Sequence, residues 1–132
     1  MRLTICLAAL SLSAAFAADH PNLNGTWEGA SNGETVSIKQ QDDLVDITES
    51  GKATTEIQCH TTGQACKVKG GEVTLWYSGP MLVMMETSHG NSRVVKKRFK
   101  PSEDGKSLDL EIIRIEPAGA TEKLTLTRRS GS

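Results

Sequence analysis

The sequence predicts an all-β protein, an antiparallel up-and-down meander of about nine or ten strands that closes into a barrel. Three observations indicate this fold. Short segments rich in β-forming residues follow one another, turn signals separate them at intervals of roughly ten residues, and no segment has helical periodicity. Closure of the meander would remove exposed strand edges, which favours a barrel over an open sheet.

The first half of the chain contains four predicted strands, at residues 23–27, 35–41, 44–48 and 53–59. Val36 and Ile38 alternate with polar residues in the second of these segments, as in a half-buried strand. Two aspartates at 42–43 and a Ser-Gly-Lys sequence at 50–52 supply the turns between neighbouring strands.

The second half contains five further predicted strands, at residues 73–77, 81–87, 93–100, 108–115 and 122–129. The Gly-Gly pair at 70–71 and the Asp-Gly pair at 104–105 are hairpin signals, because these residues accept a positive φ. In the segment 108–115 the apolar phase changes from Ile112 to Ile113, which predicts a β-bulge near Ile112.

Length and composition indicate one globular domain. The chain has 132 residues, of which 37% are hydrophobic and 23% charged, and its formal net charge is −1. This charge excludes a strongly basic nucleic-acid-binding protein. After residue 17 no apolar run approaches the length of about 20 residues that a transmembrane helix needs, so no membrane anchor is expected.

The first seventeen residues have the pattern of an export signal. Arg2 precedes a mostly apolar segment at residues 3–12, and Ala15-Phe16-Ala17 provides the small residues that precede a cleavage site. We therefore expect residues 1–17 to be a signal peptide and residues 18–132 to form a single barrel domain. The mature protein would be secreted or periplasmic.

Two cysteines, Cys59 and Cys66, remain after the expected cleavage. An even number of cysteines in an exported chain indicates a disulfide, here across a predicted hairpin. A metal site with His60 as a third ligand is the alternative. It is less favoured because no fourth ligand is evident and zinc-binding cysteines are usually closer in sequence. We expect no metal.

The residues Gly25-Thr26-Trp27 carry a resemblance to known barrels. Lipocalins and other calycin-type barrels have a Gly-x-Trp motif on the first strand, and an arginine of the last strand often packs over that tryptophan. The resemblance implies a barrel-end motif of Gly25, Trp27 and Arg128. Arg128 is preferred to Arg129 because it shares strand parity with the apolar residues of the last strand.

The outline of the mature chain also resembles a family of small exported bacterial barrels of unknown function, which are lipocalin-like. Residues 22–27, 104–108 and 127–129 match its Asn-Leu-x-Gly-Thr-Trp opening, its Asp-Gly-Lys-x-Leu turn and its arginine-tipped last strand. The opening is similar to that of avidin-type barrels as well. Those barrels line their biotin pocket with several tryptophans, whereas this chain has only Trp76 besides Trp27.

No set of residues predicts catalysis. His20, His60 and His89 fall in predicted loops or in the N-terminal tail, without a visible nucleophile or orienting partner. An acidic cluster at residues 42–49 lacks the spacing of a calcium loop, so a solvated edge is favoured. The basic run of Lys96, Lys97, Arg98 and Lys100 is either an anion-binding face or an ordinary charged outer face, and the latter is favoured.

A methionine-rich segment suggests an internal cavity. Methionines suit adaptable apolar pockets, and the low aromatic content of 4% leaves few bulky residues to fill a barrel. The predicted cavity residues are Trp76, Tyr77, Leu82, Met84 and Met85. Alternation allows only one set of methionines to face the interior.

The sequence therefore favours a non-catalytic exported barrel that binds a small apolar or amphipathic ligand and uses no cofactor. The alternative is an envelope or surface interaction module with a side-chain-filled barrel and no ligand. An enzyme is the least favoured class. No feature of the sequence indicates an oligomeric state.

Overall fold

A computed structural model describes residues 20–29, 33–88 and 90–129 of the chain. The expected signal peptide, residues 1–17, and the predicted loop histidine His89 lie outside the described residues. The described part is all-β, which confirms the predicted fold class.

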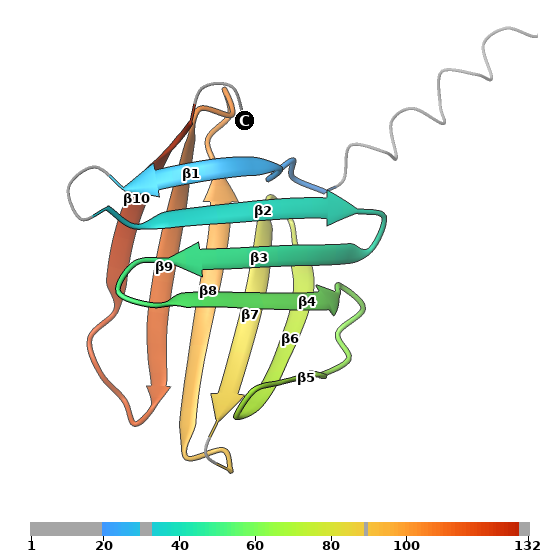
Figure 1. The fold of residues 1–132 in the computed structure, drawn as a ribbon, viewed down its shortest axis with the longest axis vertical. Coiled ribbons are helices and arrows are strands. Elements are labelled where there is room, and N and C mark those ends of the chain that lie inside the picture. The colour runs from blue at the N-terminus through green and yellow to red at the C-terminus, as the bar shows by residue number, and fades with distance from the viewer. Residues whose placement is uncertain (1–19, 30–32, 89, 130–132) are drawn as a thin grey trace, which may run out of the picture.

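Ten strands follow one another along the chain (Figure 1). They are β1 (Gly25–Gly29), β2 (Thr35–Gln41), β3 (Leu44–Ser50), β4 (Thr54–His60), β5 (Cys66–Val68), β6 (Gly71–Ser78), β7 (Met81–Ser88), β8 (Arg93–Pro101), β9 (Ser107–Glu116) and β10 (Glu122–Arg128). All pairings are antiparallel, in the order β4-β3-β2-β1-β10-β9-β8-β7-β6-β5. The predicted meander is confirmed, and the pairing of β1 with β10 joins its two ends.

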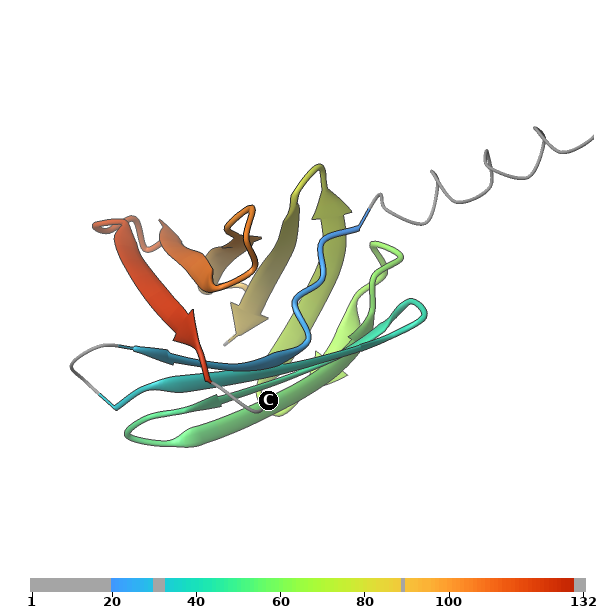
Figure 2. The same cartoon turned by 90° about the horizontal axis from the view of Figure 1, so that it is seen from above.

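The sheet folds back on itself to make two layers. In Figure 1, β1–β4 run across the front and β6–β9 run behind them in another direction. Figure 2 looks into the space between the layers and shows residues 20–24 passing between them at one end. We call this end the closed end, because buried side chains fill it.

Strand alternation places one apolar face of each strand in this space. The buried core takes its members from almost every strand. It consists of Leu23, Trp27, Val36, Ile38, Val45, Ile47, Ile57, Cys59, Val73, Leu75, Leu82, Met84, Phe99, Leu108, Leu110 and Leu126. The same alternation that predicted the strands therefore also sets the interior.

Residues with a positive φ close the tight turns. Asp42 has a φ of 55° between β2 and β3, and Gly70 has a φ of 83° between β5 and β6. In the β8–β9 turn the Ser102 hydroxyl donates a hydrogen bond to Asp104 at 2.6 Å, and the Lys106 amide donates another at 3.0 Å. The bond from Ser102, followed by that from Lys106, lowers the pKa of the Asp104 carboxyl.

The position of the bulge differs from the prediction. Ile112 pairs regularly with Lys97, and the register shift lies between Val94 and Val95, opposite the end of β9. The apolar pattern changes phase in the sequence because Ile113, a half-buried residue of the outer face, is itself apolar. Ile113 pairs with Lys96, next to the regular pair of Ile112 with Lys97.

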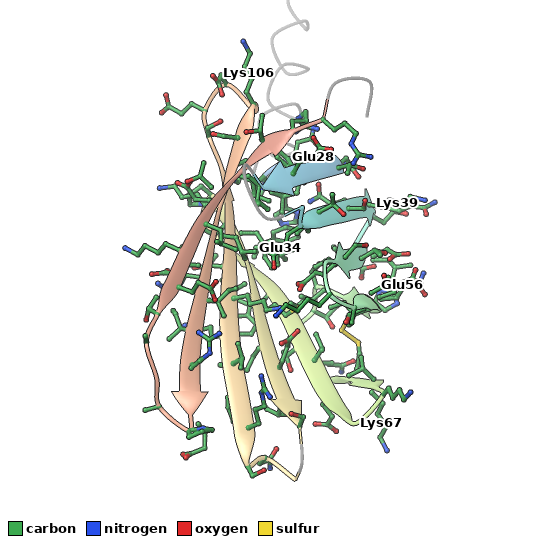
Figure 3. All side chains as sticks on the ribbon, turned by 60° about the vertical axis from the view of Figure 1, so that its left-hand side comes forward. Glu28, Glu34, Lys39, Glu56, Lys67 and Lys106 are labelled. Carbon is green, nitrogen blue, oxygen red and sulfur yellow. A yellow bond between two sulfur atoms is a disulfide. The ribbon has the colours of Figure 1, made fainter. Side chains whose placement is uncertain are left out.

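The two ends of the strand order, β4 and β5, face each other without a ladder between them. The Cys59–Cys66 disulfide joins them across this seam, with a Cα–Cα distance of 5.8 Å (Figure 3). The predicted disulfide is confirmed, but it does not staple a paired hairpin as expected. Instead it fastens the barrel where hydrogen bonding is interrupted. Strand β5, with three residues, was not predicted.

Candidate functional site

The closed end is built around Trp27, which is fully buried. Its Nε1 donates a hydrogen bond to the Leu23 carbonyl oxygen at 3.0 Å, and Arg128 lies over its ring with Cζ 4.3 Å from the centroid. The Arg128 guanidinium also donates to the carbonyl oxygen of Gly105 at 2.8 Å and to that of Asn24. These contacts leave this end of the interior packed.

Gln40 holds the N-terminal segment against the same end. Its side-chain amide donates to the Pro21 carbonyl oxygen at 2.9 Å and to the Tyr77 hydroxyl at 2.8 Å, and its Oε1 accepts from the Leu23 amide at 2.5 Å. His20 stacks on the Tyr77 ring at a centroid distance of 4.1 Å. Residues 20–23 therefore cover this end of the barrel.

The five residues predicted to line a cavity divide between the two faces of the sheet. Leu82 and Met84 are buried in the core, and Tyr77 packs against it. Trp76 and Met85 alternate with these residues and belong to the outer face, where Trp76 pairs with Val83. None of the five lines the cleft described next.

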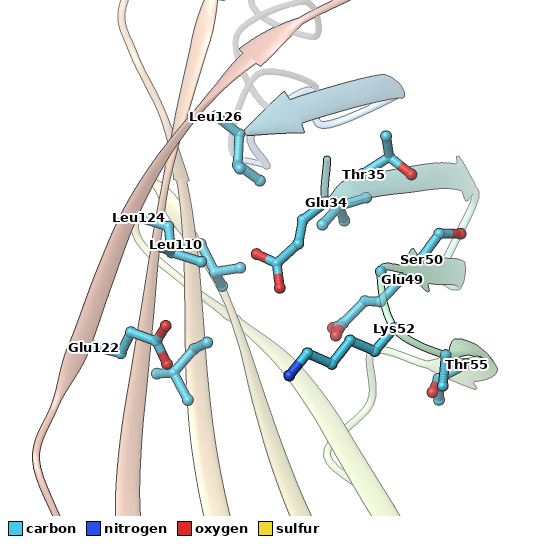
Figure 4. Close-up of a pocket in the computed structure, with 14 residues that line it drawn as sticks. Glu34, Thr35, Glu49, Ser50, Lys52, Thr55, Leu110, Glu122, Leu124 and Leu126 are labelled. Atoms are coloured by element: carbon cyan, nitrogen blue, oxygen red, sulfur yellow. The ribbon is translucent and has the colours of Figure 1, made fainter. Parts of the chain in front are cut away.

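A cleft of about 180 Å³ opens between the two layers, away from the Trp27 core (Figure 4). One wall is apolar and comes from β9 and β10, with a contribution from β2. Its members are Leu110, Ile112, Leu124, Leu126 and Val36. The opposite side is polar and comes mainly from the turns that flank β2, β3 and β4. Its charged members are Glu34, Glu49 and Lys52, and Glu122 adds a carboxylate beside the apolar wall.

An ion bridge crosses the interior beside this cleft. Lys97 of β8 is only 12% exposed, and its Nζ lies 3.0 Å from both carboxylate oxygens of Glu49 on β3. The same Nζ lies 3.5 Å from Glu86 on β7. A second hollow of about 210 Å³ lies near the seam and is lined by Glu86. Glu49 lines the cleft and Glu86 lines the second hollow, so Lys97, which contacts both carboxylates, joins the walls of the two hollows.

The sequence suggested a solvated acidic edge that includes Glu49 and a charged face that includes Lys97, and an ion pair in the interior was not predicted, although alternation carries the signal. Glu49 shares its parity with the buried residues Val45 and Ile47, and Lys97 shares its parity with Phe99. A charged residue in phase with a buried apolar face is therefore the sign that was available.

The other charged candidates lie apart from the cleft. Asp43 pairs with His60 at 2.9 Å on the surface, and Asp46 accepts a hydrogen bond from Gln58. Lys96 and Arg98 face outward, and Arg98 pairs with Glu111 at 3.0 Å. Among the described residues no three His, Cys, Asp or Glu side chains are grouped as a metal site would require.

The cleft combines an apolar wall with a charged side. No histidine or cysteine is among the described residues that line it. The apolar wall can receive a hydrocarbon group, while the charged side can contact a polar head group. Within the described part of the chain, no helix is long and apolar enough to cross a membrane.

Comparisons with known proteins support the fold. No protein family matches the sequence, and no curated protein matches it. Among solved structures, the REP1-NXSQ fatty acid transporter superposes with a TM-score of 0.67 at 14% identity, over 83% of this chain and 98% of the transporter. A secretory abundant heat soluble protein from Ramazzottius varieornatus gives 0.66 at 11% identity, over 83% of this chain and 96% of that one.

A mutant of the fluorescent protein UnaG gives a TM-score of 0.67 at 13% identity, over 82% of this chain and 96% of its own. These likenesses show the fold alone, a barrel of antiparallel strands. None of the three is named as an enzyme.

Proposed function

We propose that this protein is an exported, non-catalytic barrel that binds a small amphipathic ligand, with the apolar part of the ligand between the two layers. The cleft is the observation that carries the proposal. It sets four leucine and isoleucine side chains of β9 and β10 opposite a charged rim, within one concavity. Such a combination of apolar lining with a few polar groups is typical of small-molecule sites.

The size of the cleft limits the ligand. Its volume of about 180 Å³ is below the range of roughly 300–1,000 Å³ that is usual for ligand pockets. We therefore expect a short or slender apolar group that lies in the cleft while its polar end remains at the mouth. The likeness of the fold to a protein named as a fatty acid transporter supports a hydrocarbon chain as that group.

Binding of a neutral apolar dye tests the proposal. N-phenyl-1-naphthylamine should bind with a saturable rise in fluorescence, and dodecanol should displace it. Leu124→Trp places a larger side chain on the cleft wall and should weaken dye binding. Thr127→Trp, on an exposed position of the same strand, is the matched control and should leave it unchanged. Absence of saturable binding, or equal losses in both variants, would contradict the proposal.

The second candidate is an interaction module without a ligand. One observation favours it: much of the interior is filled by side chains, among which Trp27, Phe99, Leu82 and Met84 are almost completely buried. Failure of the dye experiment with a fully folded protein would make this candidate the better account.

Export is part of the proposal. The Cys59–Cys66 disulfide supports it, since such bonds persist in oxidising compartments. The expected cleavage after Ala17 would leave Ala18 as the first residue. N-terminal sequencing of protein recovered from the cell envelope or medium should begin there, and a product that retains Met1 would contradict export by this route.

A further inference from the structure

The charged side chains that line the cleft are unequal in sign. Glu34, Glu49 and Glu122 contribute three carboxylates, whereas Lys52 contributes the one ammonium group among the described lining residues. In Figure 4 the carboxylates lie around the mouth, on both sides of the gap between the layers. The described lining residues therefore carry two more carboxylates than ammonium groups.

The two neighbouring cations, the interior Lys97 and the exposed Arg114, already have carboxylate partners. Lys97 lies within 3.5 Å of oxygens of both Glu49 and Glu86, so two carboxylates share one ammonium group. Arg114 lies 3.3 Å from Glu122 and donates to the Ala120 carbonyl oxygen at 3.1 Å. An anionic head group would have to compete with these protein carboxylates for either cation.

Lys52 occupies the place that a head group would take. Its side chain extends from the turn between β3 and β4 into the gap, towards the wall of Leu110 and Leu124 (Figure 4). It is exposed and makes no ion pair with the described residues. A lysine of this kind has a flexible stem, so it can move out into solvent at little cost.

We infer that the cleft selects amphiphiles with a cationic head group, of the alkylammonium class, over those with a carboxylate. This inference rests on the proposed binding function. The alkyl chain would lie against the leucine wall, and the ammonium group would replace that of Lys52 between Glu34, Glu49 and Glu122. Lys52 would then compete with the ligand for these carboxylates and would not itself bind the head group.

Displacement of N-phenyl-1-naphthylamine by three ligands of equal chain length tests the inference. The ligands are dodecyltrimethylammonium, dodecanol and dodecanoate, each used below its micelle concentration. We expect dodecyltrimethylammonium to bind about tenfold more tightly than dodecanoate at low salt, with dodecanol between them. Added salt should reduce the difference, because the mouth of the cleft is open to solvent.

Charge variants locate the effect. Lys52→Gln should tighten dodecyltrimethylammonium and weaken dodecanoate, whereas the double variant Glu34→Gln with Glu122→Gln should remove most of the preference. Controls at the closed end lie in the β8–β9 turn (Figure 3 labels Lys106). Lys106→Gln changes the net charge by the same amount as Lys52→Gln, and Glu103→Gln changes it by one of the two units that the double variant changes. They should leave the preference unchanged.

The outcomes separate the two proposals. If none of the three ligands displaces the dye, the proposed binding function fails. If dodecanol displaces the dye but dodecanoate binds as tightly as the cation or more so, the function stands and the cationic selectivity is wrong. A cation preference that responds to the control variants as strongly as to the cleft variants would also overturn the inference.

Discussion

Arg128 lies across the indole ring of Trp27, with its Cζ 4.3 Å from the ring centroid. The same guanidinium donates hydrogen bonds to the carbonyl oxygens of Gly105, in the β8–β9 turn, and of Asn24, just before β1. One side chain of the last strand thus joins three segments that are far apart in the sequence. It does so over a fully buried aromatic ring, at the end of the barrel away from the cleft.

Replacement of this arginine should destabilise the fold and not affect binding directly. Lysine retains the charge but cannot reproduce the planar fork that contacts Gly105, Asn24 and the indole together. We expect Arg128→Lys to lower the free energy of unfolding by about 1–3 kcal/mol. Urea titration followed by tryptophan fluorescence measures this change.

The neighbouring arginine provides the control. Arg129 lies on the exposed side and pairs with Glu28 at 2.6 Å. Because exposed ion pairs contribute little, Arg129→Lys should change stability by less than about 0.5 kcal/mol. Equal effects of the two substitutions would show that the stacking of Arg128 on Trp27 contributes no more to stability than an exposed ion pair.

The disulfide gives a second prediction. Reduction of the Cys59–Cys66 bond in the unchanged sequence should cost about 2–3 kcal/mol of stability, because it releases a chain constraint in the unfolded state. Locally, the amides of β5 should exchange faster after reduction, since this strand has three residues and pairs with β6 alone. Hydrogen exchange read by mass spectrometry checks this, with β8 and β9 as the internal reference. Uniform acceleration over all strands would contradict a local role for the seam.

The sequence predicted the fold class because a meander is encoded locally. Alternation of apolar and polar residues indicates each strand, and glycine, aspartate or serine indicates each turn. The number and order of the strands therefore follow from short-range signals. The resemblance of Gly25-Thr26-Trp27 to calycin-type barrels added the expectation that an arginine of the last strand packs over Trp27. In the structure β1 pairs with β10, and Trp27 lies opposite Arg128.

The seam between β4 and β5 and the cleft between the layers could not be predicted from short-range sequence signals. Which two strands fail to pair depends on the curvature of the whole sheet, and β5 is too short to have a pattern of its own. The Lys97–Glu49 contact joins residues 48 positions apart on opposite layers. Alternation says that each of these side chains faces inward but not that they meet. For the same reason the sequence did not predict the cleft that β9 and β10 line, and Met84, which was expected to line a cavity, is buried in the core.

A third prediction concerns a close approach of two backbone segments. Gly71, at the start of β6, pairs with Ser88, and a Cβ built on it would lie 1.9 Å from the Thr87 carbonyl oxygen. An alanine there must force β6 and β7 apart. We expect Gly71→Ala to cost about 3 kcal/mol, at the upper end of overpacking effects. The midpoint of thermal unfolding measures it.

Gly119 is the matched position for this test. A Cβ there would meet only the flexible Arg114 side chain, at 3.4 Å and beyond. Gly119→Ala should therefore be neutral or slightly stabilising, within about 1 kcal/mol, because alanine restricts the unfolded chain. A Gly71→Ala protein as stable as Gly119→Ala would mean that β6 and β7 do not approach each other as described.

The last prediction concerns the ion bridge between the two hollows. Lys97→Met removes the ammonium group and leaves the carboxylates of Glu49 and Glu86 facing each other in the interior. Breaking a fully buried pair costs about 3–5 kcal/mol. The two carboxylates keep 30% and 32% of their surface exposed, so solvent screens them, and we expect a smaller loss of about 1–3 kcal/mol.

A triple variant, Lys97→Met with Glu49→Gln and Glu86→Gln, removes the repulsion as well as the attraction and should recover much of this loss. Urea titration of the unchanged protein, the single variant and the triple variant measures the three free energies of unfolding. A single variant as stable as the unchanged protein, or a triple variant less stable than the single one, would show that the bridge does not hold β3 to β7 and β8.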